Sequence, residues 1–454
     1  MKSKKLLSMV LILAMALHTL FMSSGISLAV TVYEDGTAEH PYLIDTAEEL
    51  FSMLEGSDLH FQLANDLDLE NIPRTPITLF SGVFDGAGYT IKNLYINRSV
   101  YGYYDGGDLA GLFGEIYEAE VRNLTMEDSE VNMDAQGRYL LAGILAGSIQ
   151  HDSYIENVVV KNSKVIISSG GAGGIASECV DSFMDNCRTE NLFVSGRFNT
   201  GLLCNLAFAS DFNNCGTIGG EALSQSGGGG LIGSIDDVTL YDCYSIDGQV
   251  ISNGGVKKYP AAVGGLVGYA YDGELFRCYS TTDVSYVNGS AGGLVGEAII
   301  SGLYQCYAKN KVEGGVYVAG LIGGRYHDDY VNSSYEIENT IKDSYSDSEI
   351  ICVNPEGIGA GAVCYNIVYL VNSYFSGSIE AENKMGLGGL TDEGNYDYIS
   401  NSYFNIATTG VTEPEDQART TSEMYQQINY VDWDFDSIWT MEDGEDYPKF
   451  QYQN

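Results

Sequence analysis

The sequence predicts an all-β fold: a single-stranded parallel β-helix, expected to be right-handed, with about ten coils between short helical caps. Two motifs recur along the chain with a shared period near 28 residues, and such a period is typical of repeat architectures. The runs between glycine, asparagine, aspartate and serine residues are short and rich in strand-forming residues, without a helical period. A unit of this size buries its apolar face only by stacking on equivalent units.

The first motif is an apolar core hinged by glycines, of the form Gly-Gly-Leu-Val-Gly. Its ten copies lie at 110–114, 142–146, 173–177, 200–204, 229–233, 264–268, 292–296, 319–323, 360–364 and 388–390. Because glycine adopts φ above zero at no steric cost, we expect these glycines to form tight bends where the coil changes direction. The chain has only seven prolines, which fits extensive strand pairing because proline lacks a ladder donor.

The second motif is a short strand in which an asparagine or another polar residue precedes an inward-facing residue. The inward residues are Leu124, Val158, Cys187, Cys215, Cys243, Cys278, Cys306, Ser344, Ser373 and Ser402. Stacking places them in one internal ladder, and the asparagines before them in a ladder of hydrogen-bonded amides. In-register neighbours lie about a strand spacing apart, beyond the roughly 3.8 Å between the Cβ atoms of a disulfide. We therefore predict buried free thiols, although cysteines in exported chains are usually paired.

Both ends of the repeat array carry capping signals. Thr46 and Glu49 form a capping box ahead of an apolar helical stretch, and Thr420 and Glu423 repeat the pattern near the other end. Trp433, Phe435, Ile438 and Trp439 are expected to lie over the last coil as a plug. The predicted segments are a signal peptide at 1–29, an N-terminal cap with the first coils at 30–108, the repeat β-helix at 109–404 and a C-terminal capping segment at 405–454.

The N-terminus has the pattern of an export signal. Lys2, Lys4 and Lys5 precede an apolar run that ends before Ser27-Leu28-Ala29, a signal-peptidase recognition pattern. An uncleaved membrane anchor is the alternative. The formal net charge of −40 argues against nucleic acid as a partner, because phosphate binding requires lysine and arginine. After removal of the signal, no integral membrane segment is expected.

The repeats resemble the GLUG-motif family, named for its Gly-Leu-x-Gly core. Gly265-Leu266-Val267-Gly268, Gly293-Leu294-Val295-Gly296 and Gly320-Leu321-Ile322-Gly323 carry this resemblance, together with Cys-Tyr-Ser at 243–245 and 278–280. The resemblance implies an exported bacterial protein, commonly surface-associated or adhesin-like. Some immunoglobulin A-cleaving metallopeptidases carry such repeats outside their catalytic part. The units that end in Cys204 and Cys364 depart from the pattern at the final glycine.

The sequence offers no catalytic constellation, no metal-ligand cluster and no cofactor motif. It lacks His-Glu-x-x-His, a Gly-x-Ser-x-Gly elbow, a phosphate-binding loop and Cys-x-x-Cys. Parallel β-helices also support polysaccharide lyases and hydrolases, which require paired carboxylates or a calcium cluster with a base. Asp328 and Asp329 beside Arg325 are the best local candidates for such a site. We predict a protein that is not an enzyme and keep a polysaccharide lyase or hydrolase as the alternative.

Two features are candidates for binding. One is a row of tyrosines directly after the inward ladder: Tyr244, Tyr279, Tyr307, Tyr345, Tyr374 and Tyr403. These rings should stack along one outer face, either as a strip for contact with a glycan or a protein, or as a ladder that stiffens the rod. The other is an insertion at 324–341 with Arg325, Tyr326, His327, Asp328 and Asp329, which is either a binding loop or an ordinary surface loop.

Export, repeats and the missing chemistry together favour a secreted or cell-surface protein that acts as an adhesion or interaction scaffold. A surface glycan or a host or cell-envelope protein is the expected partner. A polysaccharide-active enzyme and a passive structural stalk are the alternatives.

Overall fold

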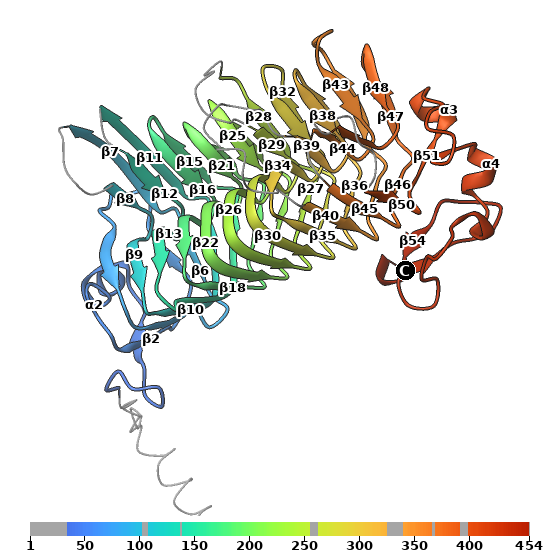
Figure 1. The fold of residues 1–454 in the computed structure, drawn as a ribbon. Helices are drawn as coiled ribbons and strands as arrows, with labels where there is room; N and C mark the ends of the chain where they lie inside the picture. Colours follow the sequence, from blue (N-terminus) through green and yellow to red (C-terminus); the bar gives the residue numbers. More distant parts are fainter. Residues whose placement is uncertain are drawn as a thin grey trace, which may run out of the picture.

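A computed structural model describes residues 34–101, 108–136, 139–254, 262–324, 339–365, 368–390 and 398–453. The described chain forms an elongated stack of parallel coils (Figure 1). One sheet of 32 strands and two sheets of ten strands each run along the stack. The predicted parallel β-helix is confirmed, and ten strands in each smaller sheet agree with about ten coils. The predicted signal peptide lies outside the described residues.

Between the two ends of the stack, each coil contributes strands to all three sheets. One coil comprises β26 (Ile232–Tyr241), β27 (Tyr244–Ile246), β28 (Gln249–Ser252) and β29 (Ala262–Gly264), and the next comprises β30 (Val267–Phe276), β31 (Tyr279–Ser280), β32 (Asp283–Tyr286) and β33 (Ser290–Gly292). The smaller sheets run from β7 (Tyr95–Tyr101) to β47 (Ser378–Glu380) and from β8 (Asp108–Ala110) to β48 (Asn383–Met385). Neighbouring coils pair in parallel register, so equivalent side chains form continuous rows.

Close packing of the coils, not a left-handed backbone, explains the glycines of the first motif. A Cβ on Gly292 would lie 1.8 Å from the carbonyl oxygen of Val295. A Cβ on Gly293 would lie 2.2 Å from the carbonyl oxygen of Gly320 in the next coil. Neither glycine has φ in the left-handed region. The expectation of positive φ at these positions is therefore wrong, since the requirement is space for neighbouring backbone.

The left-handed corners lie instead at the polar residue of the second motif. All ten of these residues have φ between 47° and 56°: Asn123, Asn157, Asn186, Asn214, Asp242, Arg277, Gln305, Asp343, Asn372 and Asn401. Asparagine tolerates this conformation better than most residues. The predicted amide ladder is confirmed in the early coils, where the Asn157 amide donates to Asn123 at 3.0 Å and Asn214 donates to Asn186 at 3.0 Å.

The inward residues that follow these corners accept hydrogen bonds from backbone amides that the corner leaves without a backbone partner. The Ser373 hydroxyl accepts from the Ser344 amide at 3.1 Å and donates to the Val371 carbonyl at 2.9 Å. Cys306 occupies the same position and accepts from the Cys278 amide at 3.4 Å. All nine cysteines are buried and unpaired, as predicted. Burial raises the pKa of Cys215 and of Cys278, so these two thiols remain protonated donors.

Replacing Ser373 with alanine should destabilise the protein by about 1–3 kcal/mol, because the buried Ser344 amide loses its hydrogen-bond partner, whereas the Val371 carbonyl keeps its bond from the Asp343 amide. Cysteine at position 373 is the matched control, since cysteine fills the equivalent position of five coils, and it should restore most of the loss. Urea unfolding followed by circular dichroism measures both variants. An alanine variant as stable as the wild type would show that the ladder requires only small side chains and no hydrogen bond.

The strand register corrects several of the predicted repeat copies, as two of them illustrate. In the last copy, Val363 pairs with Gly388, so Gly386-Leu387 is the equivalent of Gly361-Ala362, and the predicted Gly389-Leu390 is not. In the copy at 200–204, Cys204 pairs with Ile232, which places Leu202 at the position of Gly230. The sequence alignment of glycines was wrong there because neighbouring glycines offer more than one match.

The predicted helical caps are present. The helix α2 (Ala47–Met53) begins at the Thr46–Glu49 capping box and buries Leu50 at the N-terminal end of the stack. The helix α4 (Thr421–Met424) begins at the Thr420–Glu423 capping box, and a 3₁₀ turn, η1 (Gln427–Asn429), follows it. Between the last coil and α4 lie α3 (Ile406–Thr409) and β52 (Ala418–Arg419). Within the described ranges, no helix is long and apolar enough to cross a membrane.

Candidate functional site

The six predicted tyrosines form one row on the outside of the β-helix core. Tyr279 and Tyr307 stack with ring centroids 4.8 Å apart and planes within 1° of parallel. The stack extends to Tyr244 on one side, at 5.7 Å, and through Tyr345 to Tyr374 on the other, at 5.1 and 4.9 Å. Tyr403 continues the row in strand register with Tyr374. The predicted stacking on one outer face is therefore confirmed from Tyr244 to Tyr374.

Half of this row is covered by the C-terminal segment, defined here as residues 420–453. Tyr345, Tyr374 and Tyr403 are only 1%, 3% and 5% exposed, because Trp433, Trp439 and Phe450 pack against them. The expectation of an open strip of six rings is wrong for these three. The expectation of a tryptophan plug over the last coil is also wrong, since the tryptophans lie along the side of three coils.

Polar contacts fix the C-terminal segment to successive coils. The Tyr374 hydroxyl donates to the Pro448 carbonyl, and the Tyr452 hydroxyl donates to the Gln305 carbonyl, each at 2.7 Å. The Trp433 indole donates to the Asn401 carbonyl at 2.7 Å. The Trp439 indole lies 3.5 Å from a carboxylate oxygen of Asp343, and burial raises the pKa of this carboxyl group. The segment is thus bound to four coils by side-chain and backbone groups.

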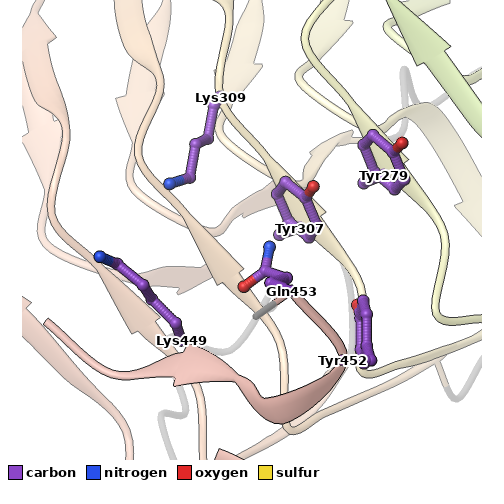
Figure 2. A pocket seen from close by; sticks show the side chains of 6 residues that line it. All are labelled: Tyr279, Tyr307, Lys309, Lys449, Tyr452 and Gln453. Atoms are coloured by element: carbon purple, nitrogen blue, oxygen red, sulfur yellow. The ribbon is translucent and has the colours of Figure 1, made fainter. Parts of the chain in front are cut away.

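A groove opens where the C-terminal segment stops covering the row, and we take this groove as the candidate site. It is lined by Tyr279, Tyr307, Lys309, Lys449, Tyr452 and Gln453, and its volume is about 370 Å³ (Figure 2). Tyr279 and Tyr307 come from the coils, whereas Lys449, Tyr452 and Gln453 come from the C-terminal segment. The two lysine side chains lie toward one end of the groove, and Tyr279 and Tyr452 lie toward the other.

The groove combines cationic groups with phenol rings. The Lys309 ammonium lies 5.4 Å from the centroid of the Tyr345 ring, and Lys449 is paired with Asp446. Burial and the neighbouring tyrosines raise the pKa of Tyr279 to about 12, and burial also raises the pKa of Tyr307. Both hydroxyls therefore remain protonated at neutral pH and can donate as well as accept hydrogen bonds.

The predicted binding residues of the insertion at 324–341 cannot be compared with this groove. Arg325, Tyr326, His327, Asp328 and Asp329 lie outside the described residues, so the predicted binding loop stays a prediction. Among the described residues, no three histidine, cysteine, aspartate or glutamate side chains are placed to share a metal ion.

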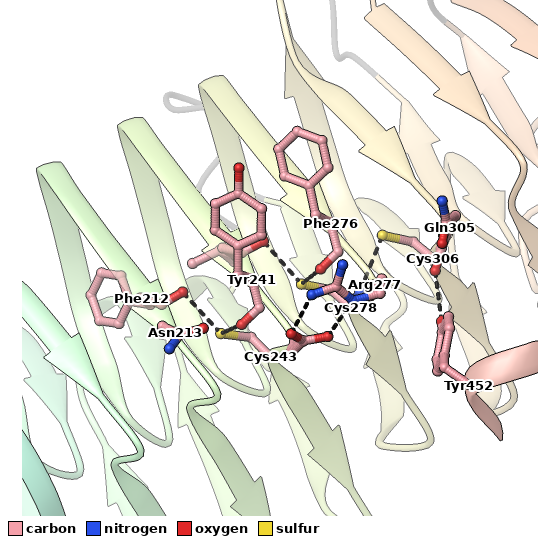
Figure 3. A network of polar contacts seen from close by, with 12 residues as sticks. Phe212, Asn213, Tyr241, Cys243, Phe276, Arg277, Cys278, Gln305, Cys306 and Tyr452 are labelled. Atoms are coloured by element: carbon pink, nitrogen blue, oxygen red, sulfur yellow. Dashed lines mark hydrogen bonds and ion pairs between the residues drawn. The ribbon is translucent and has the colours of Figure 1, made fainter. Parts of the chain in front are cut away.

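Sequence reasoning missed the contribution of Lys449, Tyr452 and Gln453, because nothing in the repeats indicates where the chain returns after the last coil. It also missed a second row of aromatic rings, formed by Tyr241, Phe276 and Tyr304, three residues before the tyrosines of the first row. Their common offset was a signal available in the sequence. Between the two rows, Arg277 and Asp242 form an ion pair across neighbouring coils at the left-handed corner (Figure 3).

These features define a parallel β-helix repeat protein. The model of the GLUG motif matches residues 259–285, a segment that contains Gly265-Leu266-Val267-Gly268. The chain therefore carries the GLUG motif, and its resemblance to the GLUG-motif repeat family is confirmed.

The chain is similar over part of its length to two curated proteins. It is 35% identical over 140 residues to a "Putative Gly-rich membrane protein" of Evansella cellulosilytica, covering 28% of this chain and 15% of that protein. It is 31% identical over 146 residues to Halomucin of Haloquadratum walsbyi, covering 29% of this chain and 2% of that protein. The aligned part is thus a small fraction of both relatives.

Two solved structures are also similar. One is described as a "putative immunoglobulin A1 protease" from Bacteroides ovatus, with a TM-score of 0.41 and 16% identity over 93% of this chain and 95% of that chain. The other is described as an IgA1 protease, with a TM-score of 0.35 and 15% identity over 75% of this chain and 21% of that chain.

Proposed function

We propose that the protein is a non-enzymatic interaction scaffold, secreted or held at the cell surface, that binds a glycan strand in the groove between the tyrosine row and the C-terminal segment. The observation that carries this proposal is the groove itself, where the buried half of the row ends and Tyr279 and Tyr307 become accessible beside two lysines. A rigid stack of coils holds these groups at fixed spacing, which lowers the entropy lost on binding.

The chemistry of the groove suits a hydroxyl-rich ligand with acidic substituents. Phenol rings offer apolar area with a polar tip, and the Gln453 amide both donates and accepts hydrogen bonds. Lys309 and Lys449 supply positive charge on a chain whose formal net charge is −40. A carboxylated or sulfated sugar therefore binds more favourably in the groove than on the neighbouring surface. A glycan of this kind fits better than a neutral one.

Binding is a better fit than hydrolysis. Glycoside hydrolysis requires two carboxyl groups on either side of the scissile bond, and the described side chains that line the groove include none. The nearby Asp446 carboxylate forms an ion pair with Lys449. Burial alone would raise the pKa of this carboxyl group, but Lys449 and Lys309 lower it below its ordinary value. It therefore stays ionised and cannot serve as a proton donor near neutral pH.

An extracellular or surface location is supported by the names of the relatives, a glycine-rich membrane protein and Halomucin. The basic and apolar N-terminus with a small-residue cleavage pattern supports export independently. Because the aligned part is a small fraction of those relatives, their own partners and activities are not transferred to this chain.

A glycan array tests the proposal, and we expect acidic glycans to bind in preference to neutral ones. The double variant Tyr279→Ala with Lys309→Gln should weaken binding by about tenfold or more, because it removes a ring and a charge from the groove. Lys164→Gln, an exposed lysine on a different sheet, is the matched control and should leave the affinity unchanged.

Three outcomes would contradict the proposal. They are the absence of binding to any glycan, binding that the groove variant leaves intact, and release of reducing ends or unsaturated products from acidic polysaccharides. The last of these would indicate a polysaccharide-active enzyme.

A further inference from the structure

A second aromatic row stands on the large sheet, on the other side of the left-handed corner. Tyr241, Phe276 and Tyr304 occupy equivalent positions of three successive coils. Their rings stack at 4.8 and 4.9 Å with planes within 12° of parallel. Figure 3 shows the Tyr241 and Phe276 rings on the outer side of the strands, away from the buried thiols. Tyr241 is 41% exposed, and Phe276 and Tyr304 are half-buried.

This second row differs from the tyrosine row in what surrounds it. The tyrosine row is partly covered by the C-terminal segment and faces two lysines. Tyr452 of that segment bonds to Gln305 at the corner between the rows. Tyr271, one row further along the sheet, is 40% exposed. The apolar area on this face therefore remains open to a partner.

Carboxylates lie on the same strands as these rings, with Glu274 two residues before Phe276 and Asp236 five residues before Tyr241. Asp236 lies beside Tyr271 in strand register, Glu274 accepts a hydrogen bond from Tyr304, and Asp237 and Asp272 are exposed next to them. Within the described part of the chain, no lysine or arginine forms an ion pair with any of these four carboxylates. Burial, Asp237 and Asp272 raise the pKa of Asp236, and burial raises that of Glu274, so the negative charge here is poorly compensated.

We propose that this face, formed by Tyr241, Phe276 and Tyr304 with Asp236 and Glu274, is a docking surface for a cationic polypeptide segment. Arginine and lysine side chains of the partner would pair with the carboxylates and lie against the aromatic rings. Their aliphatic parts would cover the apolar area between the charges. The surface is distinct from the glycan groove and does not depend on it.

Charge favours a cationic polypeptide over the other partners that could bind an open aromatic face. A second copy of the chain would bring a formal net charge of −40 toward an acidic face, and a nucleic acid would bring phosphates. Both are repelled. A basic polypeptide is instead attracted by the charge of the whole molecule and then held by the local carboxylates and rings.

The test measures binding of fluorescently labelled deca-arginine to the full chain at physiological salt, by anisotropy. The double variant Tyr241→Ser with Phe276→Ser should weaken binding by about tenfold. So should Asp236→Asn with Glu274→Gln, which keeps an acceptor for the Tyr304 hydroxyl and tests the surface even if the aromatic variant fails to fold. The control Asp443→Asn with Glu445→Asn removes two exposed carboxylates elsewhere and should change the affinity by less than about twofold.

Equal weakening by the control and by the acidic variant would show that deca-arginine binds diffusely, and this would overturn the proposal. No measurable binding to the wild type would overturn it as well. Lys309→Gln in the glycan groove should leave deca-arginine binding unchanged, so that failure of the groove and failure of this surface are distinguishable.

Discussion

Replacing Trp439 with alanine should detach the C-terminal segment from the tyrosine row while the coils remain folded. Trp439 is fully buried and contacts Tyr345, Tyr374 and Phe450 at 6.3, 6.1 and 4.5 Å between ring centroids. Loss of a buried tryptophan of this kind costs about 3–5 kcal/mol. Because each coil of a solenoid contacts only its neighbours, the loss falls mainly on the segment and on the three coils beneath it.

Hydrogen exchange followed by mass spectrometry measures this effect segment by segment. We expect residues 420–453 to lose protection and the strands around Tyr374 to become partly exposed, whereas β26 and β30 keep their protection. Ile428→Ala is the control, since Ile428 is 84% exposed and its removal should change nothing. Simultaneous loss of protection in all coils would contradict a segment that docks on a preformed stack.

Replacing Gly292 with alanine should disrupt the coil that contains it. The added Cβ would lie 1.8 Å from the Val295 carbonyl oxygen and 2.8 Å from the Gly323 amide nitrogen, and both are backbone atoms that cannot move without shifting a coil. Overpacking of this severity costs about 3 kcal/mol or more. We expect a lower melting temperature and a broader unfolding transition, because stacking on both sides of the coil is lost.

Gly56→Ala is the comparison that separates close packing from backbone conformation. Gly56 has φ of 62° and nothing within 4 Å of its Cβ position, so alanine there should cost only about 1 kcal/mol of backbone strain. Calorimetry of both variants measures the difference. Equal effects at Gly292 and Gly56 would mean that the motif glycines serve backbone conformation after all.

The local features of the fold were predictable from the sequence because each coil depends on its own pattern and on its neighbours. The two capping boxes, the inward Cys and Ser ladder, the asparagine ladder and the stacking of tyrosines all follow from periodicity and alternation. Most of the motif glycines were correctly placed in the repeat, but their role was misassigned. Positive φ and lack of space both select glycine, and only the positions of neighbouring carbonyls distinguish them.

The groove could not be predicted, because it depends on a contact between distant parts of the chain. Tyr345 bonds to Gln453, which lies 108 residues away, and no repeat period connects these two positions. An aromatic segment after the last coil indicated only that something apolar must be covered. The segment covers the side of the stack, where Tyr345, Tyr374 and Tyr403 supply the apolar surface.

The most direct test of the groove is the affinity of the strongest acidic glycan for Trp439→Ala compared with the wild type. Trp439 does not line the groove, but its loss removes Lys449, Tyr452 and Gln453 from the tyrosine row together. We predict that the dissociation constant rises by about tenfold or more, although Tyr279 and Tyr307 stay in place. The account would be contradicted by an unchanged dissociation constant in a variant whose C-terminal segment is shown by hydrogen exchange to be detached. Such a result would mean that the segment contributes nothing to glycan binding.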